Sequence, residues 1–475
     1  MLGHQKPKNS MFQMVSVEEL VPQDHFLRQL DAVVDFSFIR DRVRPLYCED
    51  NGRPSVDPEL ALRMFILSYL YNISENRLCD EIAMHAGYRW FCRLDFHDPV
   101  PDRTTLVKLR KRWGTNDVFA DVMLHVVKAC VEAGLVSGEI LAVDGTLVKA
   151  RAATRSLETI DPPVALEEYL NTLAASDATT DEKVEPPNDN EPPSDEPPPT
   201  NSPGASERKA GDPNFRGEKF SNATHRSKTD PDARLYSKGP HQEAELRFMV
   251  HNVMDAKSCV ILEAKASQCS GDAERQAALT MLESVRRLGL DLQFLLGDGG
   301  YTAGWFLRDL MALGIEPLVP IKGEIEPLPT WQRRTFNLDH MRKRKVRVEV
   351  AAARNRARMM RESPTYRATY SLRTRMEHRF AEGKEWHGLD RARGYGLVAM
   401  DIQAKLTATV QNLKRLVRWK RRRPKAGVAI MSATVEARIE RTTATATAAH
   451  LSHFASLLRR FVPVVSKCLL PSFST

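Results

Sequence analysis

The sequence predicts an α/β fold: a mixed sheet flanked by helices and preceded by an all-helical N-terminal domain. Two observations lead to this prediction. Residues 1–135 carry a series of helix-starting residues, with apolar residues at helical spacing. From residue 136 onward, strand-like stretches and amphipathic helices follow in the order strand, strand, strand, helix, strand, helix, strand.

The N-terminal helices are marked by their first residues. Asp57 followed by Pro58 opens one helix, and Ser74 precedes another that is expected to stop near Gly87. A third begins after Asp102 and has two different faces. Leu106, Leu109 and Trp113 form an apolar stripe. Lys108, Lys111 and Arg112 share another face.

A row of short helices that ends in a basic one resembles a helix-turn-helix type of DNA-binding domain. An ordinary helical bundle with solvated charges fits the same pattern. The whole chain has a formal charge of +8, which favours a polyanionic partner. Residues 1–135 are therefore a candidate DNA-binding domain, with Lys108, Lys111 and Arg112 as candidate contacts.

The sequence indicates a cytoplasmic protein. Its seven cysteines are scattered and never form a CxxC pair, which argues against structural zinc and a disulfide framework. The N-terminal residues lack the apolar region of a secretory signal. The richest apolar run, residues 60–72, is too short to span a bilayer and contains Arg63.

The sheet domain is predicted over residues 136–155 and 230–423, with two interruptions. Residues 156–229 form an insertion that contains EKVEPPNDNEPPSDEPPPTNSPG, an acidic, Pro-rich stretch with almost no apolar content, which predicts disorder. Residues 331–365 form a densely basic insertion. The sequence assigns no role to the C-terminal tail at 424–475.

Three acidic residues stand out by position. Asp144 closes the first strand, Asp298 closes the strand after the helix, and Glu377 lies on the last core helix. Because the ends of neighbouring strands meet at one edge of a sheet, these residues could form an all-oxygen pocket. Such ligands suit Mg²⁺ or Mn²⁺, and two ions roughly 4 Å apart would polarise a phosphodiester.

Each aspartate also has a plainer interpretation. Asp-Gly after an apolar run is an ordinary turn, so Asp144 or Asp298 alone favours a structural role. Asp255 competes as a third strand-end acid, but it lies in an obvious hairpin turn. Strand order favours Asp298, since the helix before it brings that strand back beside the first.

Four residues around the glutamate share a segment without a helix breaker until Gly383: Tyr370, Arg373, Glu377 and Lys384. At roughly 100° per residue they would lie on one helical stripe. An acid among phosphate-binding donors suits a site that grips a metal-bound phosphodiester. The alternative is a surface ion pair between Arg373 and Glu377, worth about 0.2–0.5 kcal/mol.

Three sequence blocks together carry a family resemblance. VDGT (143–146), GDGGY (297–301) and Y-x2-R-x3-E-x6-K (370–384) resemble the catalytic blocks of bacterial insertion-sequence DDE transposases. HGLDRARGYG and TATVQNLKRL, further along, are also typical of that group, and the likeness covers most of residues 10–420. The family implies an RNase H-like catalytic core and places the third block in its Y-R-E-K motif.

The resemblance implies roles for these residues. Asp144, Asp298 and Glu377 would bind two catalytic Mg²⁺ or Mn²⁺ ions, while Arg373 and Lys384, assisted by Tyr370, would hold DNA phosphates. The implied reaction is hydrolysis at the element's ends, followed by attack of the freed 3′-hydroxyl on target DNA. Double-stranded DNA would be the partner, with a homodimer in the synaptic complex and the bacterial nucleoid as the place of action.

Several alternatives stay open. The basic insertion could track DNA through Arg342, Lys343, Arg344 and Lys345, or could be a solvated charged loop. The protein could be another RNase H-like DNA nuclease, or a DNA-binding protein descended from a transposase that has lost catalysis. A covalent role for Tyr370, as in tyrosine recombinases, is disfavoured because no nucleophile arrangement is apparent.

Overall fold

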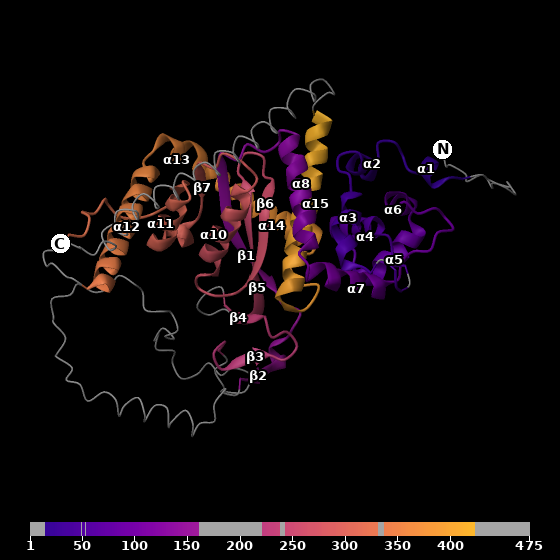
Figure 1. Ribbon diagram of the computed structural model, residues 1–475, viewed down its shortest axis with the longest axis horizontal. Helices are drawn as coiled ribbons and strands as arrows, with labels where there is room; N and C mark the ends of the chain where they lie inside the picture. Colours follow the sequence, from indigo (N-terminus) through magenta and orange to yellow (C-terminus); the bar gives the residue numbers. More distant parts are fainter. Residues whose placement is uncertain are drawn as a thin grey trace, which may run out of the picture.

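The computed structural model describes residues 15–48, 50–52, 54–160, 221–237, 243–330 and 337–422. Figure 1 shows N-terminal helices at one end, a sheet in the middle and a second group of helices at the other end. This is the predicted mixed α/β arrangement with a helical N-terminal region, and it is consistent with an RNase H-like core.

The N-terminal region is helical where the capping residues predict it. Asp57 accepts a hydrogen bond from the Glu59 amide at 2.8 Å, and Asp102 accepts one from the Thr104 amide at 2.7 Å. The longer helices are α4 (Pro58–Leu70), α5 (Glu75–Met84), α7 (Arg103–Gly114) and α8 (Val118–Glu132). The short ones are α1 (Val17–Leu20), α2 (Phe26–Asp31), α3 (Phe38–Val43), the 3-10 turn η1 (Arg44–Leu46) and α6 (Ala86–Phe91).

The expected helix stop at Gly87 is wrong. Helix α5 ends at Met84, because His85 adopts an extended backbone, and α6 then begins at Ala86 with Gly87 inside it. The His85 side chain accepts a hydrogen bond from the Tyr88 amide at 3.3 Å and so caps the new helix.

The sheet has the strand order β6-β5-β1-β7-β8, with β4 also pairing with β5. Strands β5 and β6 form the predicted antiparallel hairpin beside β1, while β7 is parallel to both β1 and β8. The bounds are β1 (Ile140–Lys149), β4 (Arg234–Tyr236), β5 (Glu245–Asp255), β6 (Ile261–Gln268), β7 (Phe294–Leu296) and β8 (Glu316–Leu318).

Helices connect and cover these strands. The crossover helix α10 (Ala273–Arg286) returns the chain from β6 to β7, as the order of elements predicts. After β7 come the 3-10 turn η3 (Gly299–Thr302) and α11 (Gly304–Ala312), then α12 (Leu338–Arg361) and α13 (Pro364–Thr369) beyond β8. The last elements are the 3-10 turn η4 (Tyr370–Arg373), α14 (Thr374–His387) and α15 (Gly396–Arg422).

The predicted interruptions are described only in part. The two ends of the acidic insertion pair as a small antiparallel sheet, β2 (Leu157–Thr159) with β3 (His225–Ser227), after the 3-10 turn η2 (Thr154–Ser156). The Pro-rich stretch between these strands and the tail predicted from residue 424 lie outside the described residues. Within the basic insertion, α12 packs against α11 and β8.

Helix α15 joins the two halves of the molecule. It packs against β6 on one side and against α8 and α4 on the other, and Figure 1 shows it between the sheet and the N-terminal helices. Its buried Asn412 accepts a hydrogen bond from the Ile261 amide at 2.9 Å and donates one to the Ile261 carbonyl at 2.7 Å. The helical region and the sheet consequently share one continuous hydrophobic core. In the part of the chain that the structure describes, no helix combines the length and apolar character needed to cross a membrane.

Candidate active site

Asp144 lies within β1 rather than at its end. The strand continues to Lys149 because the antiparallel partner β5 stays paired with it, so the expectation that it closes at Asp144 is wrong. The parallel partner β7 stops earlier, and its last pair with β1 joins Ala142 to Leu296. Asp144 therefore stands two residues beyond the parallel part of the sheet.

Asp298 occupies the equivalent position on the neighbouring strand. It follows Leu296 by two residues, as Asp144 follows Ala142, and adjacent strands lie about 5 Å apart. There it caps η3, with Oδ1 accepting a hydrogen bond from the Gly300 amide at 2.8 Å. The sequence prediction that the crossover helix brings Asp298 beside the first strand is confirmed by this pairing.

The environment of Asp144 disfavours a charged carboxylate. Burial, followed by the negative charge of Asp298, raises its pKa to about 6. A hydrogen bond from the Gly145 amide at 2.8 Å and the positive charge of Arg373 oppose that shift. Asp144 and Asp298 thus face each other closely enough to repel, with an arginine nearby that offsets part of the repulsion.

Glu377 lies on α14, the helix that covers β1, and no contact in the described structure joins it to Asp144 or Asp298. Helix α14 and turn η4 both contact β1. Arg373 donates to Glu377 Oε1 at 3.0 Å, and the side chain of Glu377 is 56% exposed whereas that of Arg373 is 22% exposed. The ion pair given above as the alternative interpretation is therefore present, and the same arginine acts electrostatically on Asp144. Arg373 lies between the strand-borne acid and the helix-borne one.

The four-residue stripe is not formed on one continuous α-helix. Tyr370 and Arg373 belong to η4, and α14 begins only at Thr374. Tyr370 stacks on Tyr366 at 4.5 Å between ring centroids, and its hydroxyl donates to the Gly297 carbonyl at 3.5 Å. These contacts hold the 3-10 turn against the end of β7, next to Asp298.

Lys384 lies further along α14, half-buried and seven residues after Glu377. Seven residues are about two helical turns, so the two side chains share a face. Gly383 does not break this helix, which ends at His387 and is capped by Gly388 with a φ of 71°. A Cβ at Gly383 would come within 3.2 Å of Leu389 and 3.3 Å of Thr407, so the glycine permits close packing there.

Asp255, the competing strand-end acid, has a structural role. It is fully buried, and its carboxylate accepts hydrogen bonds from the Ser137 hydroxyl, the Gly138 amide and both the amide and hydroxyl of Ser258. Four donors satisfy both of its oxygens. This acid fixes the hairpin turn, as its position in the sequence indicated.

The predicted basic contacts lie on two helices far from each other in the sequence. On α7 the apolar residues Leu106, Leu109 and Trp113 are buried, which leaves the basic residues on the outer face. Of the predicted contacts on α7 and α12, Arg344 is half-buried and the others are exposed: Lys108, Lys111, Arg112, Arg342, Lys343 and Lys345. In Figure 1, α7 and α12 lie at opposite sides of the sheet.

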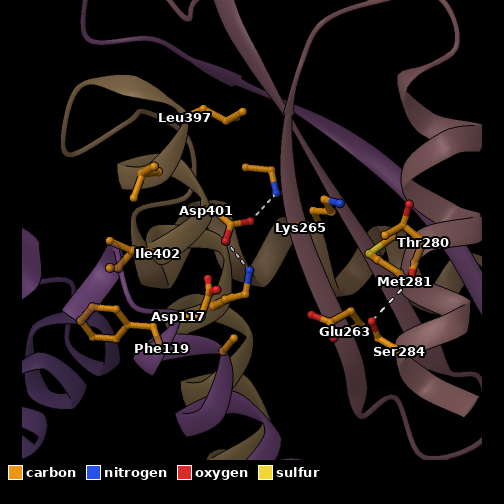
Figure 2. A pocket seen from close by; sticks show the side chains of 15 residues that line it. Asp117, Phe119, Glu263, Lys265, Thr280, Met281, Ser284, Leu397, Asp401 and Ile402 are labelled. Carbon is orange, nitrogen blue, oxygen red and sulfur yellow. Dashed lines mark hydrogen bonds and ion pairs between the residues drawn. The ribbon is translucent and has the colours of Figure 1, made fainter. Parts of the chain in front are cut away.

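A cavity of about 530 Å³ lies away from these acids. Figure 2 shows it between β6 and α10 on one side and α15 with the start of α8 on the other. Asp401 lines it and accepts hydrogen bonds from Lys405 and from the Ala266 amide. Asp144, Asp298 and Glu377 do not line this cavity, so it is not part of the candidate active site.

The donors at the candidate site match a hard divalent cation in type. Asp144, Asp298 and Glu377 offer carboxylate oxygens, which Mg²⁺ and Mn²⁺ prefer. Among the described residues, no three or more His, Cys, Asp or Glu side chains are already grouped closely enough to hold a metal ion. In this structure Glu377 is paired with Arg373.

One acid near the aspartates was not predicted. Glu274, in the first turn of α10, faces Asp298, whose charge adds to burial in raising the Glu274 pKa. Sequence gave little sign of it, because an acidic residue in the first turn of a helix is common for reasons of the helix dipole alone.

Two family models match the chain. One, described as Transposase domain (DUF772), matches residues 15–112, and the other, described as Transposase DDE domain, matches residues 220–413. The second match includes Asp298 and Glu377 but begins after Asp144. No solved structure matches the chain. The two matches fall on the helical N-terminal region and on most of the sheet domain, and with the observed fold they show that the chain belongs to the insertion-sequence DDE transposases.

Proposed function

We propose that this transposase hydrolyses a phosphodiester at the ends of an insertion sequence and joins the freed 3′-hydroxyl to target DNA. The observation that carries the proposal is the matched placement of Asp144 and Asp298, each two residues beyond the last parallel pair of β1 and β7, with α14 lying over β1. The family supports DNA as the partner.

Both steps exchange one bond for another. In hydrolysis the oxygen of water bonds to phosphorus and the bond from phosphorus to O3′ breaks, which leaves a 3′-hydroxyl and a 5′-phosphate; one proton of water ends on the leaving O3′ and the other passes to solvent. In strand transfer that 3′-hydroxyl bonds to a target phosphorus, and a target O3′ leaves. Neither step needs an external energy source or a covalent protein–DNA intermediate.

Asp144, Asp298 and Glu377 would hold two Mg²⁺ or Mn²⁺ ions in this proposal. Such ions, when bound, polarise the phosphodiester and lower the pKa of water. The protein's own contribution is to position the strand-borne aspartates by backbone hydrogen bonds and the glutamate by a helix that packs on β1. Water is the attacking group first, and the DNA hydroxyl second.

Arg373, Lys384 and Tyr370 would orient the DNA backbone. Arg373 presents a planar fork suited to bidentate phosphate binding, whereas Lys384 presents a point charge on the same helical surface as Glu377. Arg373 already contacts Glu377 and acts on Asp144, so a phosphate bound by it would lie beside both acids. Tyr370 is positioned by its contact with Gly297, next to Asp298.

A strand-transfer assay tests the proposal. The DNA flanking the coding region supplies the substrate, since imperfect inverted repeats bordered by short direct duplications would mark the element's ends. We expect the full chain with Mg²⁺ to cut such an end duplex and to join it to a target plasmid. Cutting without joining would favour another RNase H-like nuclease, and binding without cutting would favour a transposase-derived DNA-binding protein. Two end duplexes held by two copies of the chain would support the proposed homodimer.

The basic face of α12 is expected to contribute to DNA affinity through phosphates. Replacing Arg342, Lys343 and Lys345 together by alanine should lower the magnitude of the slope of log K against log salt by about one for each lost phosphate contact. The measurement is fluorescence anisotropy of an end duplex over a salt series.

Arg356→Ala is the matched control, because this arginine on the same helix is already paired with Glu316 at 2.8 Å. Its slope should stay close to that of the parent. An unchanged slope in the triple variant would contradict a DNA-binding role for this part of α12.

A further inference from the structure

Glu274 lies between the two segments that carry the aspartates. Its Oε1 is 3.0 Å from the position that a Cβ would take at Gly145, the residue after Asp144. Its Oε2 is 3.5 Å from the corresponding position at Gly300, two residues after Asp298. One carboxylate oxygen therefore lies toward each aspartate-bearing segment.

The start of α10 is fixed in this place. Arg275, the next residue, donates to the Gly300 carbonyl at 2.8 Å and to the Gly271 carbonyl at 2.8 Å. These bonds tie the first turn of the helix to the loop that begins at Asp298. Glu274 lies among like charges. The charge of Asp298 raises the pKa of Glu274, and the charges of Asp298 and Glu274 both raise the pKa of Asp144. Repulsion among these like charges opposes a closer approach of the three carboxylates in the absence of a cation.

Two buried polar groups next to these acids have no hydrogen-bond partner in the described structure. The first is the hydroxyl of Tyr301, a residue that is 1% exposed. The negative charges of Glu274, Asp144 and Asp298 add to burial in raising the pKa of this hydroxyl. The other is Nδ1 of the fully buried His251, 3.2 Å from the Cβ position at Gly145. Leaving such groups unsatisfied is costly, so their position points to a bound ion with its water molecules.

We propose that Glu274 is an additional carboxylate ligand of the divalent-cation site formed with Asp144 and Asp298. The inference rests on the proposed function for its metal, but it assigns the ligand to a residue outside the three transposase blocks. A cation there would offset the repulsion among the three acids. Tyr301 and His251 would bind its water molecules, by donating from the hydroxyl and through Nδ1, respectively.

The test is calorimetric titration of the full chain with Mn²⁺ in the absence of DNA. Glu274→Gln keeps the size of the side chain and removes its charge, and we expect it to weaken Mn²⁺ binding by about 10- to 100-fold. Glu283→Gln is the matched control, because Glu283 is exposed on the same helix. The thermal midpoint without metal should be unchanged or higher in Glu274→Gln, since repulsion with Asp298 is lost.

The possible outcomes separate the inference from the proposed function. Weaker binding in Glu274→Gln and parent-like binding in Glu283→Gln would support the inference. Parent-like binding in Glu274→Gln with weaker binding in Asp298→Asn would overturn it and leave the proposed metal site standing. Absence of Mn²⁺ binding by the folded parent chain would overturn both.

Discussion

Replacing Glu377 by alanine is expected to reduce Mg²⁺-dependent cleavage of an end duplex by on the order of a thousandfold or more. The physical reason is loss of the one proposed metal ligand that α14 contributes, opposite the two strand-borne aspartates. Folding should be little affected, because the side chain is 56% exposed and its ion pair with Arg373 is of the surface type. Duplex binding should stay close to that of the parent or become slightly tighter, since a negative charge near Arg373 is removed.

Glu385→Ala provides the comparison for this variant. Glu385 is exposed on the same helix, and the change removes the same charge and the same number of atoms. It should cut the duplex at the parental rate. The measurement is a single-turnover cleavage time course, accompanied by anisotropy binding curves in Ca²⁺. Equal cleavage by the parent and Glu377→Ala would refute the assignment of Glu377 as a catalytic ligand.

Most helices and strands were predictable because the sequence patterns that mark them are local. Helix-capping residues such as Asp57 and Asp102, the hairpin turn at Asp255 and the crossover before Asp298 each depend on a few neighbouring residues. The end of a strand is different, since it depends on which partner pairs with it. β1 continues past Asp144 because β5 extends further than β7, which the sequence of β1 alone does not specify.

Residues of the candidate site were predictable from the sequence only where they belong to a recognisable motif. Glu274 belongs to no motif, and its proximity to Gly145 and Gly300 results from packing between α10 and the sheet. The 3-10 turn at Tyr370 has a similar cause, because the contact of its hydroxyl with Gly297 joins segments far apart in sequence. The spacing of residues along one helix predicts neither the position of Glu274 beside the aspartate-bearing segments nor the contact between Tyr370 and Gly297.

Buried polar residues in α15 were the least predictable part of the fold. An amphipathic helix with a basic end was expected there, but its buried Asn412 binds the backbone of Ile261 on β6. Among the described strands β6 pairs only with β5, and Ile261 is opposite Met254 at the register shift after Val253. A polar side chain then satisfies backbone groups that the regular ladder leaves to another partner.

Asn412→Leu is expected to lower the free energy of unfolding by about 2–4 kcal/mol. Leucine cannot replace either bond to Ile261, so one buried amide and one buried carbonyl lose their partners at the junction of β6 and α15. Because α15 also packs against α8 and α4, the loss should destabilise the helical region together with the sheet. Urea unfolding followed by both far-ultraviolet circular dichroism and tryptophan fluorescence measures the effect.

Asn355→Leu supplies a matched control, because Asn355 makes the same pair of bonds to the backbone of Glu326, at 3.0 Å and 2.6 Å, in an exposed setting. Water can take over both bonds there, so the expected cost is below about 1 kcal/mol. The difference between the two variants reports mainly on burial, since both lose the same pair of backbone bonds, although Asn355 also loses the bond that it accepts from Arg358 at 3.0 Å. Equal destabilisation by both would contradict the view that α15 secures β6 through a buried amide, and would leave apolar packing as the main link between the two halves of the molecule.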